Sequence, residues 1–81
     1  MTDAAAVSLR ALGWIVSDEQ RAQRFLDLTG LTPEGLRKVL DQPSTHRAVI
    51  AFLCAHEPDL VAAAAALEMS PARLAALQDR L

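Results

Sequence analysis

Apolar residues recur along this 81-residue chain at intervals of three and four, which is the spacing of one face of an α-helix. The sequence has no tyrosine, few β-branched residues and no sustained alternation of apolar and polar positions, so it gives no strand signal. We therefore predict an all-α fold, with one domain over residues 1–81 that forms a compact bundle of five to six short helices. The expected helices cover residues 3–16, 18–29, 33–42, 45–56, 59–67 and 71–80.

Prolines, glycines and small polar residues mark the expected helix ends. Thr32 and Ser70 each precede a proline, which is the pattern of an N-cap followed by proline at the first helical position. Gly30 suits the left-handed conformation that ends many helices. The same chemistry predicts N-caps at Asp18 and Ser44, and helix ends just before Pro43 and Pro58.

The first and fourth expected helices are apolar on almost all sides. A helix that is apolar all round is buried, so we predict that these two pair at the centre and that the others cover them. The apolar residues of the first helix are Val7, Leu9, Ala11, Leu12, Trp14, Ile15 and Val16; those of the fourth are Val49, Ile50, Phe52, Leu53 and Cys54.

The two halves of the chain match when one is shifted by 38 residues, so that residues 11–41 lie over residues 49–79 without a gap. Either an internal duplication or convergence on the same helix-ending residues explains such a match. The first interpretation predicts two three-helix units, with the first and fourth helices central. The identical pairs are Glu19/Glu57, Pro33/Pro71, Leu36/Leu74 and Asp41/Asp79.

Composition excludes several classes of protein. The net charge of −2 gives no general attraction to polyphosphate or to an anionic membrane surface. A single cysteine, Cys54, allows no internal disulfide. The longest uncharged apolar runs are far shorter than the roughly 18–20 residues that span a bilayer, and the start of the chain has no basic secretory segment. We therefore expect a cytoplasmic protein without a membrane span.

The sequence contains no recognisable catalytic or metal-binding constellation. Cys54 lies in an apolar helix, where a thiol is usually inert. His46 and His56 do not have the spacing of zinc ligands. We place His56 near the C-terminus of helix 45–56, where the helix dipole favours a cation. The expectation is that the protein is not an enzyme and has no cofactor and no metal.

Two segments, residues 24–40 and 61–77, have the helix, turn and capped second helix of a helix-turn-helix. In helix 33–42 the cations are offset by Glu34 and Asp41, and a net-negative domain lacks the phosphate neutralisation on which DNA affinity depends. We therefore favour a packing role and keep weak nucleic-acid binding as the alternative. Its candidate contacts are Arg37, Lys38, Arg73 and Arg80.

Helix 59–67 has no polar face between Leu60 and Leu67. Its alanines are either a connector that forms because alanine is the best helix former, or a flat apolar strip that accepts another helix. A homodimer could form by symmetric pairing of such strips. For Trp14, we favour a core position over a role as an interface anchor.

The spacing of several motifs resembles the bacterial DUF3572 family of proteins of unknown function. The resemblance covers nearly the whole chain and rests on Trp14-Ile15, Asp18-Glu19, Arg24-Phe25-Leu26, Thr29-Gly30-Leu31, Leu36-Arg37, Phe52-Leu53 and Glu57-Pro58. It implies a small, all-helical, cytoplasmic bacterial protein, and it implies no activity and no functional residue. Arg24 and Arg37 belong to this pattern; they either pair with carboxylates of the chain or meet an acidic partner.

The function we predict is a non-enzymatic protein-interaction or adaptor module that binds an unidentified protein partner through helix surfaces. The runner-up is the nucleic-acid binder described above. The candidate partner contacts are Arg24, Arg37, Lys38, Ala62, Ala65 and Ala66.

Overall fold

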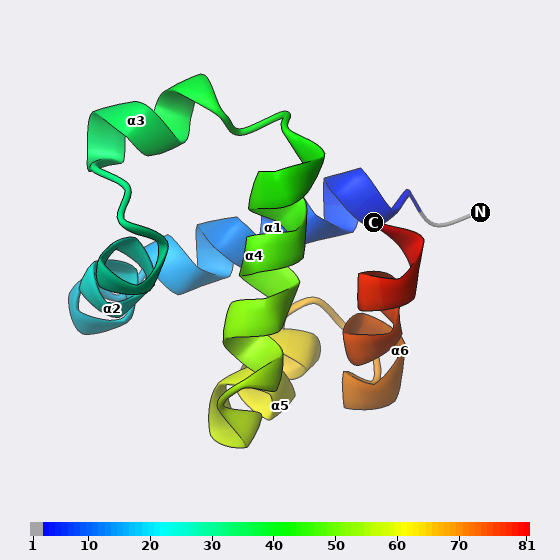
Figure 1. The fold of residues 1–81 in the computed structure, drawn as a ribbon. Coiled ribbons are helices and arrows are strands. Elements are labelled where there is room, and N and C mark those ends of the chain that lie inside the picture. The colour runs from blue at the N-terminus through cyan, green and yellow to red at the C-terminus, as the bar shows by residue number, and fades with distance from the viewer. Residues whose placement is uncertain (1–2) are drawn as a thin grey trace.

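In the computed structural model, which describes residues 3–81, two helices cross at the centre: α1 (Ala4–Val16) and α4 (Pro43–Cys54) (Figure 1). The described residues contain no strand, and the chain is 78% helical, which confirms the all-α prediction. The remaining elements are α2 (Glu19–Thr29), α3 (Pro33–Lys38), α5 (Glu57–Ala66), α6 (Pro71–Ala76) and a 3₁₀ turn, η1 (Leu77–Arg80).

The core lies where α1 crosses α4. Ala11 and Ile15 of α1 are fully buried, as are the side chains that face them from α4. The Cα radius of gyration of 11.5 Å is close to the value of about 11.7 Å for a compact chain of this length. The two helices expected at the centre do form it. Their buried partners on α4 are Val49, Ile50 and Leu53.

The other helices cover this crossing from two sides. Phe25 of α2 is fully buried and meets Phe52 of α4 edge to face, with ring centroids 5.4 Å apart and planes at 81°. That geometry is the favourable one for aromatic pairs. On the other side, α5 and its C-cap residue contribute Ala63, Ala64 and Leu67 to the same core, and α6 and η1 contribute Leu74 and Leu77.

The expectation that α1 is buried on all sides is wrong. Leu9 is 41% exposed and Val16 is 47% exposed, and Gly13 between them is also exposed. Residues 9, 13 and 16 share one helix face, and α4 covers a different face. An apolar stripe of α1 therefore stays uncovered.

Four of the residues expected to cap helices act as predicted: three begin a helix and one ends a helix. Asp18 accepts from the Arg21 N–H at 2.9 Å, and Thr32 accepts from the Gly35 N–H at 3.0 Å. Gly30 ends α2 in the left-handed conformation, with φ of 73°. The fourth is Ser70, whose hydroxyl accepts from the Arg73 N–H at 3.1 Å.

Both prolines that were expected to end helices instead begin them. Pro43 is the first residue of α4, and Pro58 is the second residue of α5. Proline fits there because the first N–H groups of a helix have no partner within the helix. Ser44 is therefore inside α4, and Gln42 holds the cap position without a side-chain bond. His56 is not at the end of α4 but at the N-cap position of α5.

Two helices are also shorter than predicted. The third ends at Lys38 instead of residue 42, because the Val39 N–H bonds to the Leu36 carbonyl and opens a turn before Pro43. The last α-helix ends at Ala76 and continues as η1, so the expected helix 71–80 is only partly α-helical.

Helix ends recur at the 38-residue spacing found in the sequence. Val16 and Cys54 both end a helix, and Pro33 and Pro71 both begin one. The left-handed Gly30 corresponds to Glu68, the non-glycine residue with a positive φ of 58°. Helices therefore begin and end at corresponding positions in both halves. Duplication and convergence explain this correspondence equally well.

Within the described residues, none of the helices is by itself both long enough and apolar enough to cross a bilayer. Taken together, α4 and α5 have sufficient length and apolar composition, but a bend of 114° separates them.

Replacing a core residue of α4 should destabilise the fold strongly. We expect Leu53→Ala to lower the free energy of unfolding by about 2–5 kcal/mol, because Leu53 is fully buried and the cavity would not collapse. Leu28→Ala, at a side chain that is 72% exposed, is the control and should change it by less than about 0.5 kcal/mol. Urea unfolding followed by circular dichroism measures both; equal losses would contradict this assignment of the core.

Two glycines should respond in opposite directions to alanine. A Cβ added at Gly13 has no atom within 4 Å, so Gly13→Ala should raise the free energy of unfolding by about 0.5–1 kcal/mol through helix propensity. Gly30→Ala should lower it by about 1–2 kcal/mol, because φ is +73° there. Thermal unfolding of both variants provides the test, and a destabilised Gly13→Ala would show that the stripe is covered in solution.

Candidate functional site

A groove of about 430 Å³ runs between α1, α2 and α3. Its lining is apolar except for one arginine, and three of its side chains are substantially exposed: Leu9, Val16 and Leu40, at 41%, 47% and 36%. Clustered exposed apolar side chains of this kind mark contact sites. The lining residues are Leu9, Leu12, Gly13, Val16, Ala22, Leu26, Pro33, Leu36, Arg37 and Leu40.

The floor of the groove is the uncovered stripe of α1. Leu9, Gly13 and Val16 follow the i, i+4, i+7 spacing of one helix face and extend over about 10 Å at 1.5 Å per residue. Gly13 leaves a notch between the two larger side chains, because no atom lies near the place of its missing Cβ. A side chain from another helix would fit between Leu9 and Val16.

The outer wall of the groove is α3, which stands apart from the crossing of α1 and α4 (Figure 1). Leu36 is the one residue of this six-residue helix that is buried. A second hollow, of about 420 Å³, lies between α2 and α4 and is bordered by Leu31 and Val39, which flank α3. Helix α3 makes few contacts with the other helices.

Arg37 is the only charged residue that lines the groove. It is exposed, and its side chain makes no hydrogen bond or ion pair within residues 3–81. Lys38 is exposed next to it on α3 but does not line the groove. The groove therefore combines an apolar surface with one positive charge, although the whole chain is net negative.

Arg24, the other arginine expected at a partner contact, is engaged within the fold. Its guanidinium pairs with Asp59 of α5 and lies 4.9 Å from the centre of the Phe52 ring. His56 shares this carboxylate, with 3.1 Å between its Nδ1 and the Asp59 Oδ2. The cluster links α2 to α5, although Arg24 remains 45% exposed.

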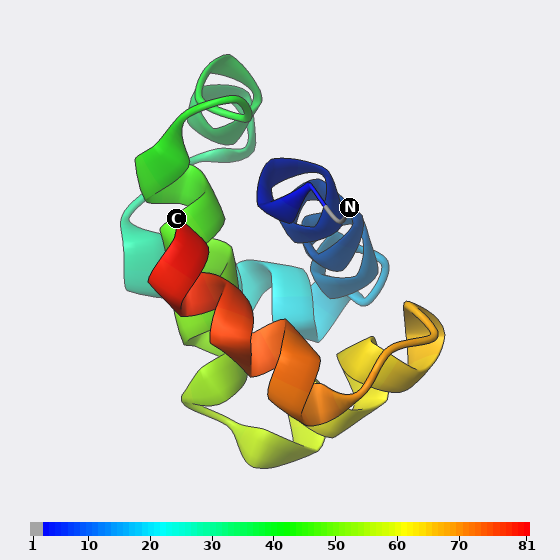
Figure 2. The ribbon, with the colours of Figure 1, turned by 90° about the vertical axis from the view of Figure 1, so that its right-hand side faces the viewer.

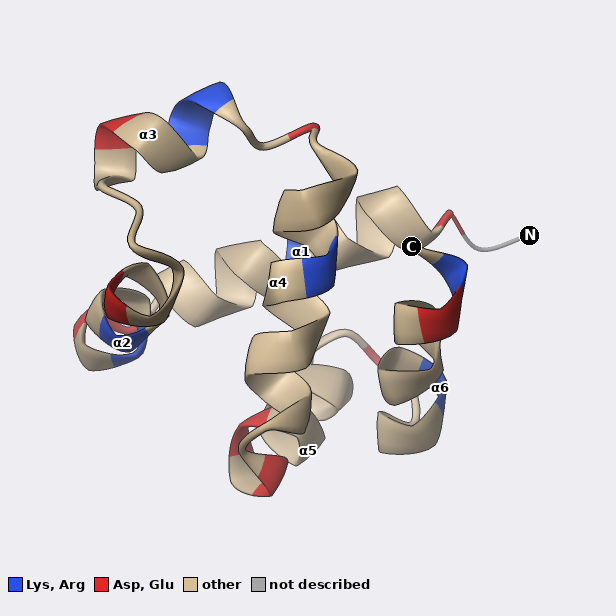
Figure 3. Cartoon of the chain, viewed as in Figure 1, with Lys and Arg blue, Asp and Glu red and all other residues tan. Residues whose placement is uncertain are grey.

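The four candidate nucleic-acid contacts do not share one surface. Arg37 and Lys38 lie at the end of α3, whereas Arg73 and Arg80 belong to α6 and η1, on the opposite side of α4 (Figure 3). Each group has acidic neighbours in sequence, Glu34 for the first and Asp79 for the second.

The alanines of α5 are split between core and surface. Ala63 and Ala64 are fully buried, while Ala62, Ala65 and Ala66 are exposed together with Val61, which is 48% exposed. A shallow hollow of about 440 Å³ follows this outer face, and it is lined by Glu57, Pro58, Val61, Ala62 and Ala65. The predicted alanine strip is thus present as a surface, with one larger apolar side chain in it.

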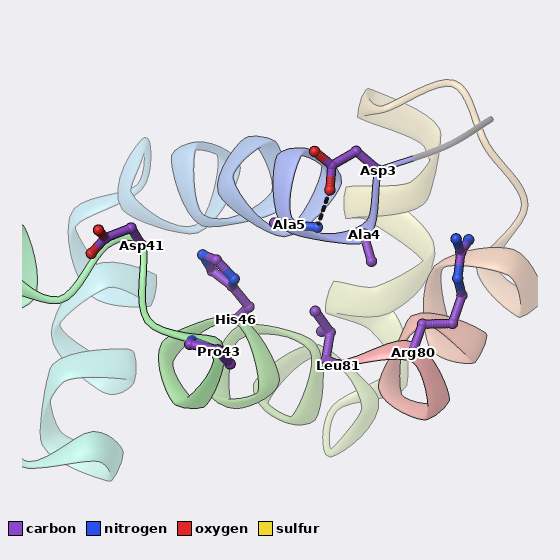
Figure 4. Close-up of a pocket in the computed structure, with 8 residues that line it drawn as sticks. All are labelled: Asp3, Ala4, Ala5, Asp41, Pro43, His46, Arg80 and Leu81. Atoms are coloured by element: carbon purple, nitrogen blue, oxygen red, sulfur yellow. Dashed lines mark hydrogen bonds between the residues drawn. The ribbon is translucent and has the colours of Figure 1, made fainter.

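Another hollow, of about 600 Å³, lies where the first turns of α1 and α4 approach the C-terminal residue (Figure 4). Its polar side chains already have structural partners: Asp3 accepts from the Ala5 N–H, and His46 Nε2 lies 2.7 Å from the Leu40 carbonyl oxygen. Asp41 and Arg80 lie at opposite ends of the hollow (Figure 4). We therefore place the candidate site in the α1–α2–α3 groove.

The remaining reactive side chains have structural surroundings. Burial raises the pKa of the Cys54 thiol, which keeps it protonated and unreactive near neutral pH. No group of three or more histidine, cysteine or acidic side chains among residues 3–81 could hold a metal ion. Trp14 is half-buried against the core, and the Arg21 guanidinium covers its ring at 3.5 Å.

Sequence reasoning found Arg37 but missed the apolar residues around it. The sequence pattern places Leu9 and Val16 in the buried centre and gives Gly13 no role. The available signal was the presence of two apolar faces on helix 3–16, since one partner helix can cover only one of them. The position of α3 over the second face could not be inferred.

Comparison with known proteins supports the family but adds no activity. A family model described as "Protein of unknown function (DUF3572)" matches residues 1–81, the whole chain. No curated protein matches the chain. No solved structure matches it either. This chain belongs to the DUF3572 family of proteins of unknown function.

Proposed function

We propose that this protein is a non-enzymatic interaction or adaptor module that receives a helix of another protein molecule in the α1–α2–α3 groove. The observation that carries the proposal is the uncovered stripe of Leu9, Gly13 and Val16. Helix-in-groove recognition uses apolar side chains at i, i+3, i+4 and i+7 spacing. We infer that the protein acts in the cytoplasm. Its single cysteine, its net negative charge and the shortness of its uncharged apolar runs are in keeping with this location.

A helix suits this groove better than an extended peptide. An extended peptide binds through backbone hydrogen bonds to an open sheet edge, and residues 3–81 contain no strand. A second helix can instead pack its side chains along the apolar stripe of α1 and approach closely at Gly13. Arg37 would then meet a carboxylate at the edge of the contact.

Photocrosslinking from the groove tests this proposal. A photoreactive side chain at Val16 should crosslink the protein to a discrete partner in extracts of the source organism, because Val16 lines the groove and is 47% exposed. Gly13→Leu in the same protein should abolish the adduct, since the added side chain fills the notch, starting from a Cβ that meets no atom of the fold within 4 Å.

A photoreactive side chain at Gln78, exposed on η1 and outside the groove, is the matched control and should not give that adduct. Adducts that persist in Gly13→Leu, or that form equally from position 78, would show that the groove is not the binding site. The absence of any protein adduct from Val16, including one with a second copy, would overturn the interaction module itself.

Nucleic-acid binding through Arg37, Lys38, Arg73 and Arg80 is the alternative. A titration with duplex DNA distinguishes it, because phosphate contacts make affinity fall steeply with salt. We expect no saturable binding at about 50 mM salt, since the four cations lie on two sides of α4 in a chain of net charge −2. Binding with a salt slope that shrinks in Arg37→Ala or Arg73→Ala would instead favour the alternative.

A further inference from the structure

We propose that the helix that occupies the groove is α5 of a second copy of this chain, so that the protein associates with itself through an α5-in-groove contact. This inference rests on the proposed function and names its partner. The two surfaces are the groove of α1, α2 and α3 and the outer face of α5, and two properties make them complementary: charge and shape.

The charges of the two surfaces are opposite. Arg37 is the only charged residue that lines the groove, and Glu57 is the only charged residue that lines the hollow on α5. The side chain of neither residue makes a hydrogen bond or ion pair within residues 3–81, unlike that of the neighbouring Asp59, which pairs with Arg24. Each surface therefore has one unpaired charge at an otherwise apolar contact, and the charges attract each other across it.

The shapes of the two surfaces also match. Leu9 and Val16 protrude from α1 on either side of the Gly13 notch. On α5 the pattern is reversed: Val61 protrudes, while Ala62 and Ala65 leave a hollow beside it. Val61 placed against Gly13 would set Leu9 and Val16 over the alanines, in the manner of helix ridges packed into grooves.

The two surfaces lie on opposite sides of α1. In both Figure 1 and Figure 2, α3, the outer wall of the groove, lies above α1, and α5 lies below it. The groove of one copy therefore receives α5 of the next copy in a head-to-tail dimer, which further copies extend into an open chain.

The contact is small, so the dimer is expected to be weak. A ten-residue helix is about 15 Å long, and stable interfaces generally bury about 1,200 Å² or more in total. We expect the monomer–dimer equilibrium to lie in the micromolar to millimolar range, between about 10 µM and 1 mM.

Sedimentation equilibrium of the full chain across that range tests the proposal. The intact protein should shift from monomer to dimer and then to longer chains as its concentration rises. Arg37→Glu and Glu57→Arg should each weaken the dimer by about tenfold, because each places like charges at the contact. The double variant Arg37→Glu/Glu57→Arg should recover most of the association, since the pair is restored in the opposite sense.

Matched controls separate the contact from general effects of charge and stability. Lys38→Glu reverses the adjacent cation of α3, which does not line the groove, and should leave the dimer within about threefold. Glu19→Arg is the control for Glu57→Arg: both residues begin a helix, so both reversals lose the same favourable interaction with the helix dipole. Gly13→Leu should abolish the dimer while the protein stays folded by circular dichroism.

Three results would overturn this inference: a monomer at every concentration, a dimer that survives Gly13→Leu, or a dimer that weakens without recovery in the double variant. Its failure is distinguishable from that of the proposed function. If the protein is a monomer but the photoreactive side chain at position 16 still crosslinks it to a different protein, self-association is wrong and the proposed interaction module stands. A protein that neither associates nor crosslinks removes both.

Discussion

The crossing of α1 and α4 is the contact on which every other element of this fold depends. Ile15 meets a face of α4 that includes Val49 and Ile50, and all three side chains are fully buried. The other helices are short, and a short helix forms mainly because its apolar face packs against something. Without this crossing, α2 and α5 would have no surface to cover, and residues 3–81 would lose the core that they share.

The same crossing creates the groove, because α1 has two apolar faces and α4 occupies one of them. The second face is sheltered at its edges by α2 and α3, but α3 has only six residues and is anchored by Leu36. It therefore borders the stripe without covering it. The groove follows from a mismatch between an apolar central helix and the short helix that passes over it.

Local signals along the chain predicted the helices and several of their caps, since Asp18, Thr32 and Ser70 act on residues only three positions away. The prediction for Pro43 and Pro58 was wrong because the sequence does not distinguish a proline that follows the end of one helix from a proline in the first turn of the next. Contacts between distant segments were out of reach. Arg24 and Asp59 are 35 positions apart, and nothing in the sequence distinguishes this pairing from Arg24 with Asp27.

The composition of the stripe is itself an argument for a partner. Exposed Leu9 and Val16 forgo about 25 cal/mol for each Å² of apolar surface left in water, and a glycine inside a helix costs about 0.5–1 kcal/mol relative to alanine. Polar side chains and an alanine would serve a solvent-facing helix better. A notch flanked by apolar side chains becomes favourable only when another surface fills it. Because Arg37 adds one unpaired cation at the rim, that surface should be apolar and bear a carboxylate, as the outer face of α5 does.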